Sequence, residues 1–175
     1  MSKRAISTQK APKAVGPYSQ AIESNGFLYV SGQLPVDATT GEFVAGGVKE
    51  QAAQVLKNIG YILSEAGYSF DNVVKSTVYL TDMKDFVVMN EVYASFYNEP
   101  YPARVAFAVV ALPKGALIEI DVIATKYLQS YNAVKKVGYL STFFVFQIIN
   151  CTFVKDFDIY SDKSHPHKIN QCTIY

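Results

Sequence analysis

Two stretches of the chain carry apolar residues at spacings of three and four, the pattern of an amphipathic helix. The longer stretch follows Gly46-Gly47, ends near Gly67, and has its apolar positions at Val48, Ala52, Val55, Ile59, Ile62 and Ala66. The second stretch lies behind Asp85, a residue type suited to a helix N-cap. Its apolar side is formed by Phe86, Met89, Val92 or Tyr93, and Phe96. The pattern therefore predicts two helices.

Shorter runs between and around these helices are typical of β-strands. Residues 20–24 and 27–32 flank Asn25-Gly26, a dipeptide that favours a two-residue hairpin. Further strands are expected over 73–81, 104–111 and 117–127, and in the last one an apolar face alternates with a partly acidic face. A hairpin followed by helix, strand, helix, strand and strand predicts an α+β fold with both helices on one face of a mixed sheet.

The pattern changes after Leu128. Residues 129–175 show neither a clean period nor turn-bounded elements, so we expect a domain over 1–128 and a poorly ordered or loosely packed extension beyond it. Within the extension, residues 141–149 could add an edge strand, but an uncharged β-prone segment of this kind also promotes aggregation when it is exposed.

The amino-acid composition limits the kinds of molecule that the chain is expected to bind. Of 175 residues 50% are hydrophobic, and 16 basic against 15 acidic residues give a net charge of +1 without a basic stripe. We therefore expect a small-molecule partner and no nucleic acid. Cys151 and Cys172 cannot form a disulfide framework, and no apolar run approaches the roughly 20 residues of a membrane span. A cytoplasmic location is expected, or a mitochondrial or plastid one if an upstream targeting segment is missing.

Several chemistries are not expected. Both histidines, His165 and His167, lie in the extension, so the domain has no Ser-His-Asp or Cys-His arrangement. Two histidines around one proline do not make a zinc site, which needs three or four ligands at workable spacing. The sequence contains neither a Walker A loop nor a GxGxxG after a strand. No metal and no cofactor are therefore expected.

The candidate site residues are polar side chains in apolar or β-prone surroundings: Tyr18, Ser31, Asn90, Arg104 and Glu119. A lone strand arginine is often a rim residue with a snorkelling stem. Pro100 and Pro102 stiffen the approach to Arg104, however, which suits a guanidinium that must meet a carboxylate in bidentate fashion. Glu119 either faces solvent or faces a cleft where it orients water, and the sequence favours neither.

Five segments in order resemble the RidA/YjgF reactive intermediate deaminase family over about residues 6–127: "APKAVGPYSQAI", "VSGQLPVD", "VVKSTVYLTDMKDFVVMNEVYASF", "YPARVAF" and "ALPKGALIEIDVIA". The resemblance implies a chorismate mutase-like (ferredoxin-like) fold in which a homotrimer builds a barrel-like core with clefts between subunits. It also implies an enzyme that hydrolyses 2-iminobutanoate and 2-iminopropanoate, or their enamine tautomers, to 2-oxo acids and ammonia, which protects pyridoxal-phosphate enzymes.

The resemblance also implies roles for individual residues. Arg104 would hold the substrate carboxylate and Glu119 would position or activate water, with Tyr18, Ser31 and Asn90 completing the catalytic cleft. Substrate contacts are further expected from Gly32, Ala106 and Phe86. A protonated imine is already electrophilic, so orientation, a placed water and proton handling suffice without a covalent nucleophile.

A ribonuclease or translation inhibitor is an alternative, because that activity is also associated with this family, but the balanced charge and the lack of a histidine pair in the domain oppose it. A non-enzymatic carboxylate-metabolite sensor or holdase-like chaperone using the same clefts is a third alternative. The extension has no counterpart in the family. It could cap a cleft, disturb assembly, or come from a misread gene boundary.

Overall fold

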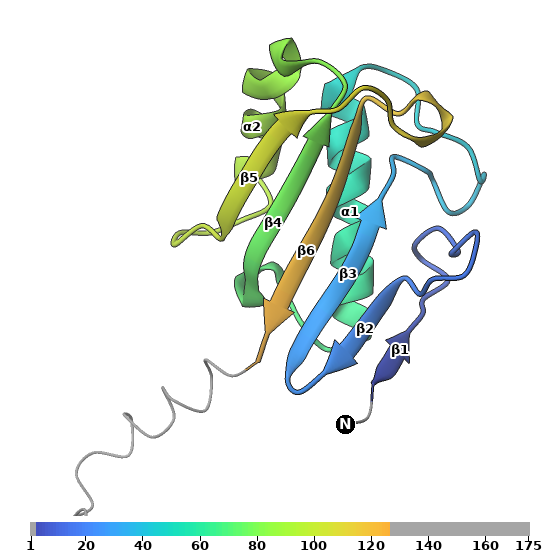
Figure 1. Ribbon diagram of the computed structural model, residues 1–175, viewed down its shortest axis with the longest axis vertical. Coiled ribbons are helices and arrows are strands. Elements are labelled where there is room, and N and C mark those ends of the chain that lie inside the picture. The colour runs from blue at the N-terminus through green and yellow to red at the C-terminus, as the bar shows by residue number, and fades with distance from the viewer. Residues whose placement is uncertain (1–2, 127–175) are drawn as a thin grey trace, which may run out of the picture. The chain divides into compact units, whose positions relative to one another are not determined.

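The computed structural model describes residues 3–126, and the predictions made for residues 129–175 lie outside that range. Figure 1 shows a twisted sheet with the helices α1 and α2 behind it. The strands are β1 (Arg4–Ile6), β2 (Ala21–Ser24), β3 (Phe27–Gln33), β4 (Val73–Leu80), β5 (Ala103–Ala108) and β6 (Ile118–Thr125), and the helices are α1 (Val48–Glu65) and α2 (Phe86–Ala94). Three short 3₁₀ turns precede β4, α2 and β6: Phe70–Asn72, Met83–Asp85 and Pro113–Gly115.

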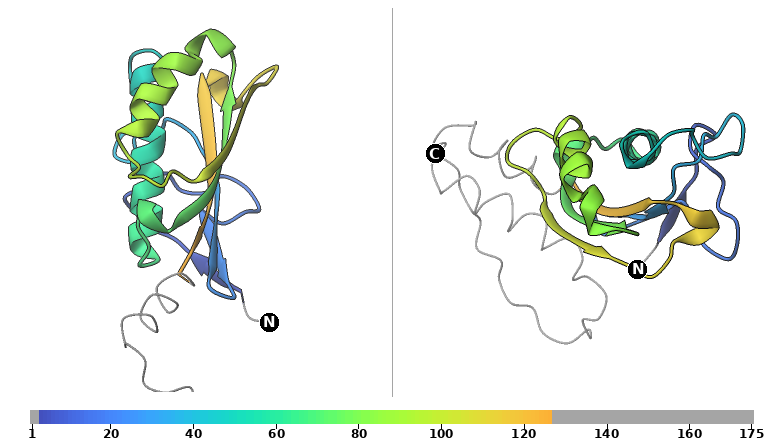
Figure 2. Two further views of the ribbon diagram at one scale, coloured as in Figure 1. Left: turned by 90° about the vertical axis from the view of Figure 1, so that its left-hand side faces the viewer. Right: turned by 90° about the horizontal axis from the view of Figure 1, so that it is seen from above.

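The six strands form one mixed sheet in the order β1-β2-β3-β6-β4-β5. Only β4 and β5 run parallel, and the chain between them contains α2. Figure 2 shows both helices on the same side of the sheet. The predicted α+β arrangement, a mixed sheet with two helices on one face, is confirmed.

The predicted hairpin is confirmed between β2 and β3. Asn25 and Gly26 have φ values of 52° and 77°, the left-handed conformations that a type I′ turn requires at both central residues. β1, which pairs with β2 through Arg4 and Glu23, was not predicted. A three-residue strand is too short to show a period, and its pairing depends on partners about twenty residues away.

The first helix matches its prediction. Its apolar face, including Val55, Ile59 and Ile62, is completely buried against the sheet. Gly47 is the N-cap, and its N–H donates to the Glu50 carboxylate over 2.9 Å. The backbone N–H of Glu50 itself and then that of Gly47 lower the pKa of the Glu50 carboxyl. Gly67 follows the helix with a φ of 75°, a left-handed conformation that glycine adopts without a Cβ clash.

The second helix is shorter than predicted. It ends at Ala94, so Phe96 lies beyond it, and Asp85 is the N-cap without a side-chain capping bond. The Ser95 hydroxyl donates to the Val92 carbonyl over 2.7 Å, a local bond that competes with continuation of the helix. The apolar spacing continues past Ala94, but there the Ser95 and Phe96 N–H groups donate to carbonyls only three residues back, over 3.1 Å each, and the α-helix stops.

The sheet has one buried face and one open face, meaning the face turned away from α1 and α2. In β6 the alternate residues Ile118, Ile120, Val122 and Ala124 are buried beneath the helices, as predicted. Large apolar residues nevertheless remain on the open face: Phe27, Tyr29, Val105 and Phe107 are 37–47% exposed. A soluble single chain rarely leaves so many aromatic and branched side chains together on a sheet.

Candidate functional site

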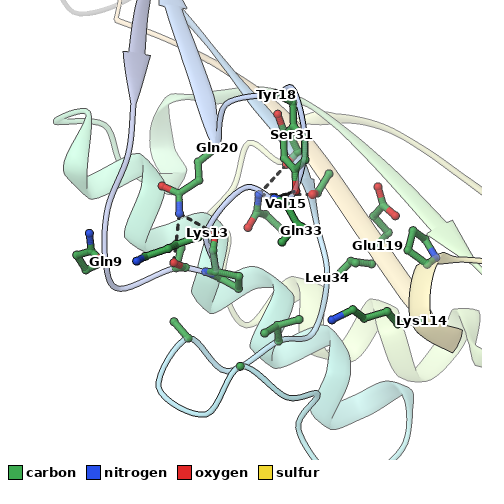
Figure 3. A pocket seen from close by; sticks show the side chains of 17 residues that line it. Gln9, Lys13, Val15, Tyr18, Gln20, Ser31, Gln33, Leu34, Lys114 and Glu119 are labelled. Carbon is green, nitrogen blue, oxygen red and sulfur yellow. Dashed lines mark hydrogen bonds between the residues drawn. The ribbon is translucent and has the colours of Figure 1, made fainter.

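A cavity of about 850 Å³ lies beside the ends of β3 and β6. Its wall is formed by the segment before β2, the end of β3, the loop that follows β3, and the turn before β6. Four of the predicted site residues line it together: Tyr18, Ser31, Gly32 and Glu119 (Figure 3). Lys13 and Lys114 also line this cavity and add positive charge that favours an anionic ligand.

Glu119 is the titratable carboxyl group of this cavity. Burial raises its pKa above the ordinary value of 4.5, and the nearby Asp121 carboxylate raises it further. The Tyr79 hydroxyl donates to Asp121 over 3.0 Å, so Asp121 already has a partner. A carboxyl group with a raised pKa and no hydrogen-bond partner among the described residues is suited to accept and return a proton.

Gly32 explains how the Glu119 carboxylate fits against β3. A Cβ atom placed on Gly32 would overlap the Glu119 carboxylate. The sheet register shifts between Val30 and Gln33, so this part of β3 departs from regular pairing with β6. Glycine at position 32 therefore makes room for the carboxylate.

Ser31 and Tyr18 add hydroxyl groups to the same wall. The Ser31 hydroxyl donates to the Ser19 carbonyl over 2.7 Å, which orients its oxygen lone pairs. The Tyr18 hydroxyl accepts from the Val15 N–H over 3.3 Å and keeps its own proton for donation. The Tyr18 side chain is 51% exposed, which leaves it accessible to a ligand or to another protein chain.

Gln20 holds this wall together, and the sequence predictions missed it. Its side chain is buried, accepts from the Thr8 N–H over 2.7 Å, and donates to the carbonyls of Thr8, Ala11 and Pro12 over 3.1, 3.2 and 2.7 Å. These bonds tie the segment before Tyr18 to β2. The sequence signal for Gln20 was its place in the "GPYSQA" motif. Its role could not be predicted from the motif, because its hydrogen-bond partners lie up to twelve residues away in the sequence.

The remaining predicted residues form a second cluster where β5 meets α2. The Arg104 guanidinium lies over the rings of Tyr93 and Phe86, with its Cζ 4.6 and 5.7 Å from their centroids. Within residues 3–126 the guanidinium makes no hydrogen bond or ion pair, so its N–H groups are open to a ligand. Asn90 is on the same helix, and its buried Oδ1 has no partner in the described part of the chain.

The two clusters cannot meet within one protomer, because Arg104 and Glu119 face opposite sides of the sheet. Arg104 is paired with Ser76 of β4, and Ser76 is fully buried on the helix side. Glu119 is paired with Tyr79, three residues further along β4 and therefore on the open face. Ala106, two residues after Arg104, shares the helix side with it.

The described residues show neither a metal centre nor a membrane span. No group of three or more His, Cys, Asp or Glu within residues 3–126 is arranged to hold a metal ion. Over the same range, no helix is both long and apolar enough to cross a membrane.

The family model described as endoribonuclease L-PSP matches residues 8–126. A RutC family protein of Pyrococcus horikoshii is 56% identical over 124 residues, covering 71% of this chain and 98% of that protein. The human 2-iminobutanoate/2-iminopropanoate deaminase is 52% identical over 122 residues, covering 70% of this chain and 89% of that protein.

Solved structures lead to the same family. The crystal structure of RidA from an Antarctic Psychrobacter species superimposes with a TM-score of 0.68 at 50% identity, covering 70% of this chain and 98% of that one. The matching family model spans more than half of the chain and contains both clusters of predicted residues. The chain therefore belongs to the endoribonuclease L-PSP family, which is the RidA/YjgF family that its motifs resemble.

Proposed function

We propose that this chain is a 2-iminobutanoate/2-iminopropanoate deaminase, which hydrolyses reactive 2-imino acids to 2-oxo acids and ammonia. The human deaminase at 52% identity supports this activity. The cavity supports it independently, because it places a carboxyl group of raised pKa among hydroxyl groups and lysines. Removal of such imines would protect pyridoxal-phosphate enzymes, which release them.

One observation carries the detailed proposal: the carboxylate anchor and the proton-handling group lie on opposite faces of the sheet. A small imino acid can contact both only if Arg104 of one copy approaches Glu119 of another. The apolar open face, with Tyr29 47% and Phe107 44% exposed, offers a surface for such association. The functional unit in this proposal is a homotrimer with its sites between subunits.

Each residue then has a defined part. Arg104 binds the substrate carboxylate through its open N–H groups, and Asn90 and Phe86 border it on α2. Glu119 acts as general base and acid, while the hydroxyl groups of Tyr18 and Ser31 hydrogen-bond to the reacting centre. Gly32 and Ala106 keep the backbone close to the substrate at the two sides of the site.

The chemistry is an addition followed by an elimination. Water adds to the C2 carbon of the protonated imine, Glu119 accepts one water proton, and the C=N electron pair moves onto the nitrogen, which becomes a neutral amine. The resulting carbinolamine has hydroxyl and amino groups on C2. Glu119 returns its proton to the nitrogen, the C–N bond breaks, and the released ammonia takes the hydroxyl proton, which gives the 2-oxo acid and ammonia in its protonated form.

The activity can be tested with a threonine dehydratase, which releases 2-iminobutanoate from threonine. Semicarbazide is included as a competing trap for the imine, and free 2-oxobutanoate is followed with time. Wild-type protein should accelerate its formation at the expense of the trapped product. Absence of acceleration by wild type would refute the deaminase proposal.

The description of the matched family favours a second candidate, cleavage of RNA. Residues 3–126 contain no histidine that could serve as an acid or base in phosphodiester cleavage, and the chain has no excess of basic residues that would favour binding to RNA. Incubation with labelled RNA at low salt decides the question. Cleavage that persists in Glu119→Gln would favour the ribonuclease over the deaminase.

A metabolite sensor or holdase-like chaperone is the third candidate, because ligand binding at the same clefts needs no turnover. It predicts 2-oxobutanoate binding that depends on Arg104, with no acceleration of imine hydrolysis by wild type. Titration calorimetry alongside the semicarbazide assay separates it from the enzyme.

The proposed deaminase domain spans residues 1–128, with 129–175 as an extension outside it. The family match, which ends at residue 126, supports this division. The scarcity of cysteine supports a cytoplasmic location. Measuring the native mass of the full chain and of a version truncated at Leu128 tests whether the extension permits trimer assembly.

A further inference from the structure

Arg104 lies at the end of a column of aromatic rings under α2. The Tyr93 ring contacts the guanidinium, and the Tyr97 ring stacks on Tyr93 with centroids 4.3 Å apart and planes 23° apart. Behind Tyr97, the edge of Phe70 packs at 4.9 Å with an interplanar angle of 80°. We call Phe70, Tyr97 and Tyr93 the aromatic column.

The column is buried and its contribution is ring packing. Tyr93 and Tyr97 are only 4% and 5% exposed. The hydroxyl groups of Tyr93, Tyr97 and Ser76, which lies opposite Arg104 on β4, are buried without a hydrogen bond of standard geometry among residues 3–126. They nevertheless lie close to one another, and burial and the neighbouring Tyr93 hydroxyl raise the pKa of Tyr97.

An arginine side chain has several rotatable bonds, and no hydrogen bond within residues 3–126 holds this one. The ring of Tyr93 restricts the guanidinium plane through face contact and leaves the N–H edges open. An anchor already held in one orientation loses less conformational entropy when it binds a carboxylate.

We propose that Tyr93 is a positioning residue for Arg104, supported from behind by Tyr97. This inference rests on the proposed deaminase function, because its consequence is correct placement of the imino-acid carboxylate. Tyr93 acts through its ring and need not touch the substrate.

Kinetics test the proposal with three variants. Tyr93→Leu removes the ring and should lower kcat/KM about tenfold, mainly by raising KM, because the anchor binds ground state and transition state alike. Tyr93→Phe keeps the ring and should stay within about threefold of wild type. Phe96→Leu is the matched control, because Phe96 packs on Phe70 at 5.7 Å without contacting Arg104, and its activity should be unchanged.

Spectroscopy gives a readout that a general loss of stability would not imitate. Arg4 and Arg104 are the arginines of the chain, so ¹⁵N-arginine labelling reports both Nε–H groups and little else. The ring current of Tyr93 should displace the Arg104 signal, and Tyr93→Leu should move it toward the free-arginine position. Arg4 donates from Nε to Glu23 over 2.8 Å and is the internal reference.

The inference is supported if Tyr93→Leu alone loses kcat/KM and moves the Arg104 signal, while Tyr93→Phe retains both. It is overturned if Tyr93→Leu keeps full kcat/KM, if Phe96→Leu loses as much, or if the Arg104 signal does not move. Should Tyr93→Leu not fold, Tyr93→Met, whose flexible side chain fills more of the space, is subject to the same criteria. If wild type is inactive, the proposed function is overturned as well. If wild type is active, Arg104→Ala is inactive and Tyr93→Leu is fully active, this inference alone is overturned.

Discussion

Replacing Arg104 with alanine removes the proposed carboxylate anchor. The guanidinium lies over Tyr93 with its Cζ 4.6 Å from the ring centroid, and its N–H groups are open. A bidentate carboxylate would receive two charge-assisted hydrogen bonds, each contributing about 1.5–3 kcal/mol. Arg104 is only partly buried, so solvent screening favours the lower figure. Arg104→Ala should then lose about 3–4 kcal/mol of transition-state stabilisation, roughly 100- to 1000-fold in kcat/KM.

The assay is the threonine dehydratase reaction with semicarbazide as the imine trap. Arg104→Lys should lie between wild type and Arg104→Ala, because it keeps the charge but loses the planar fork. Arg4→Ala is the control: Arg4 pairs with Glu23 on β2, away from both clusters, and its loss should not change the rate. If Arg104→Ala is correctly folded and accelerates the reaction as wild type does, the assignment of Arg104 as the anchor is wrong.

Three further variants test the cavity. Burial raises the pKa of Glu119 above 4.5 in the folded chain, so this group contributes stability below about pH 4.5 that is lost as the pH rises through its folded pKa. Glu119→Gln should abolish deamination, because it removes the proton-handling group. It should also raise Tm at pH 7 but not at pH 4, and an equal Tm difference at the two pH values would contradict the raised pKa. Gly32→Ala should displace the Glu119 carboxylate and lower kcat at least roughly tenfold with little change in Tm. Gly47→Ala should retain activity, because a Cβ there meets only the Glu50 carboxylate at 4.0 Å, an ordinary contact; equal activity in both variants would refute the steric argument. Gln20→Leu leaves buried backbone groups unpaired and should cost about 2–4 kcal/mol in urea unfolding; an unchanged midpoint would show that Gln20 does not secure the wall.

Local patterns were sufficient to predict most of the elements. The Asn25-Gly26 turn, the apolar face of α1 and the alternation in β6 each depend on residues that are neighbours in sequence. The end of α2 was predicted too far along the chain, because apolar spacings carry no information about the hydrogen bond between Ser95 and the Val92 carbonyl. β1 was missed because its pairing is with a distant strand.

The candidate site was predicted as one set of residues, and the structure separates it into two. Alternation within β5 and β6 cannot reveal that Arg104 and Glu119 face opposite sides, because that depends on the register of both strands with β4. The aromatic column could not be predicted from the sequence either, because Phe70 comes from the turn before β4, whereas Tyr93 lies in α2 and Tyr97 follows that helix. Contacts of this kind depend on sheet order and helix placement together.

If each active site takes Arg104 from one copy and Glu119 from another, mixing two inactive variants should restore activity. Arg104→Ala and Glu119→Gln are co-expressed in equal amounts, so that subunits combine at random. A site is intact when its Arg104 and its Glu119 both come from unmodified positions, which leaves about a quarter of the sites functional in a closed ring. The co-expressed variants should therefore recover about a quarter of wild-type activity. No recovery from assemblies shown by mass to contain both variants would contradict this expectation, because a site within one protomer always carries one of the two lesions.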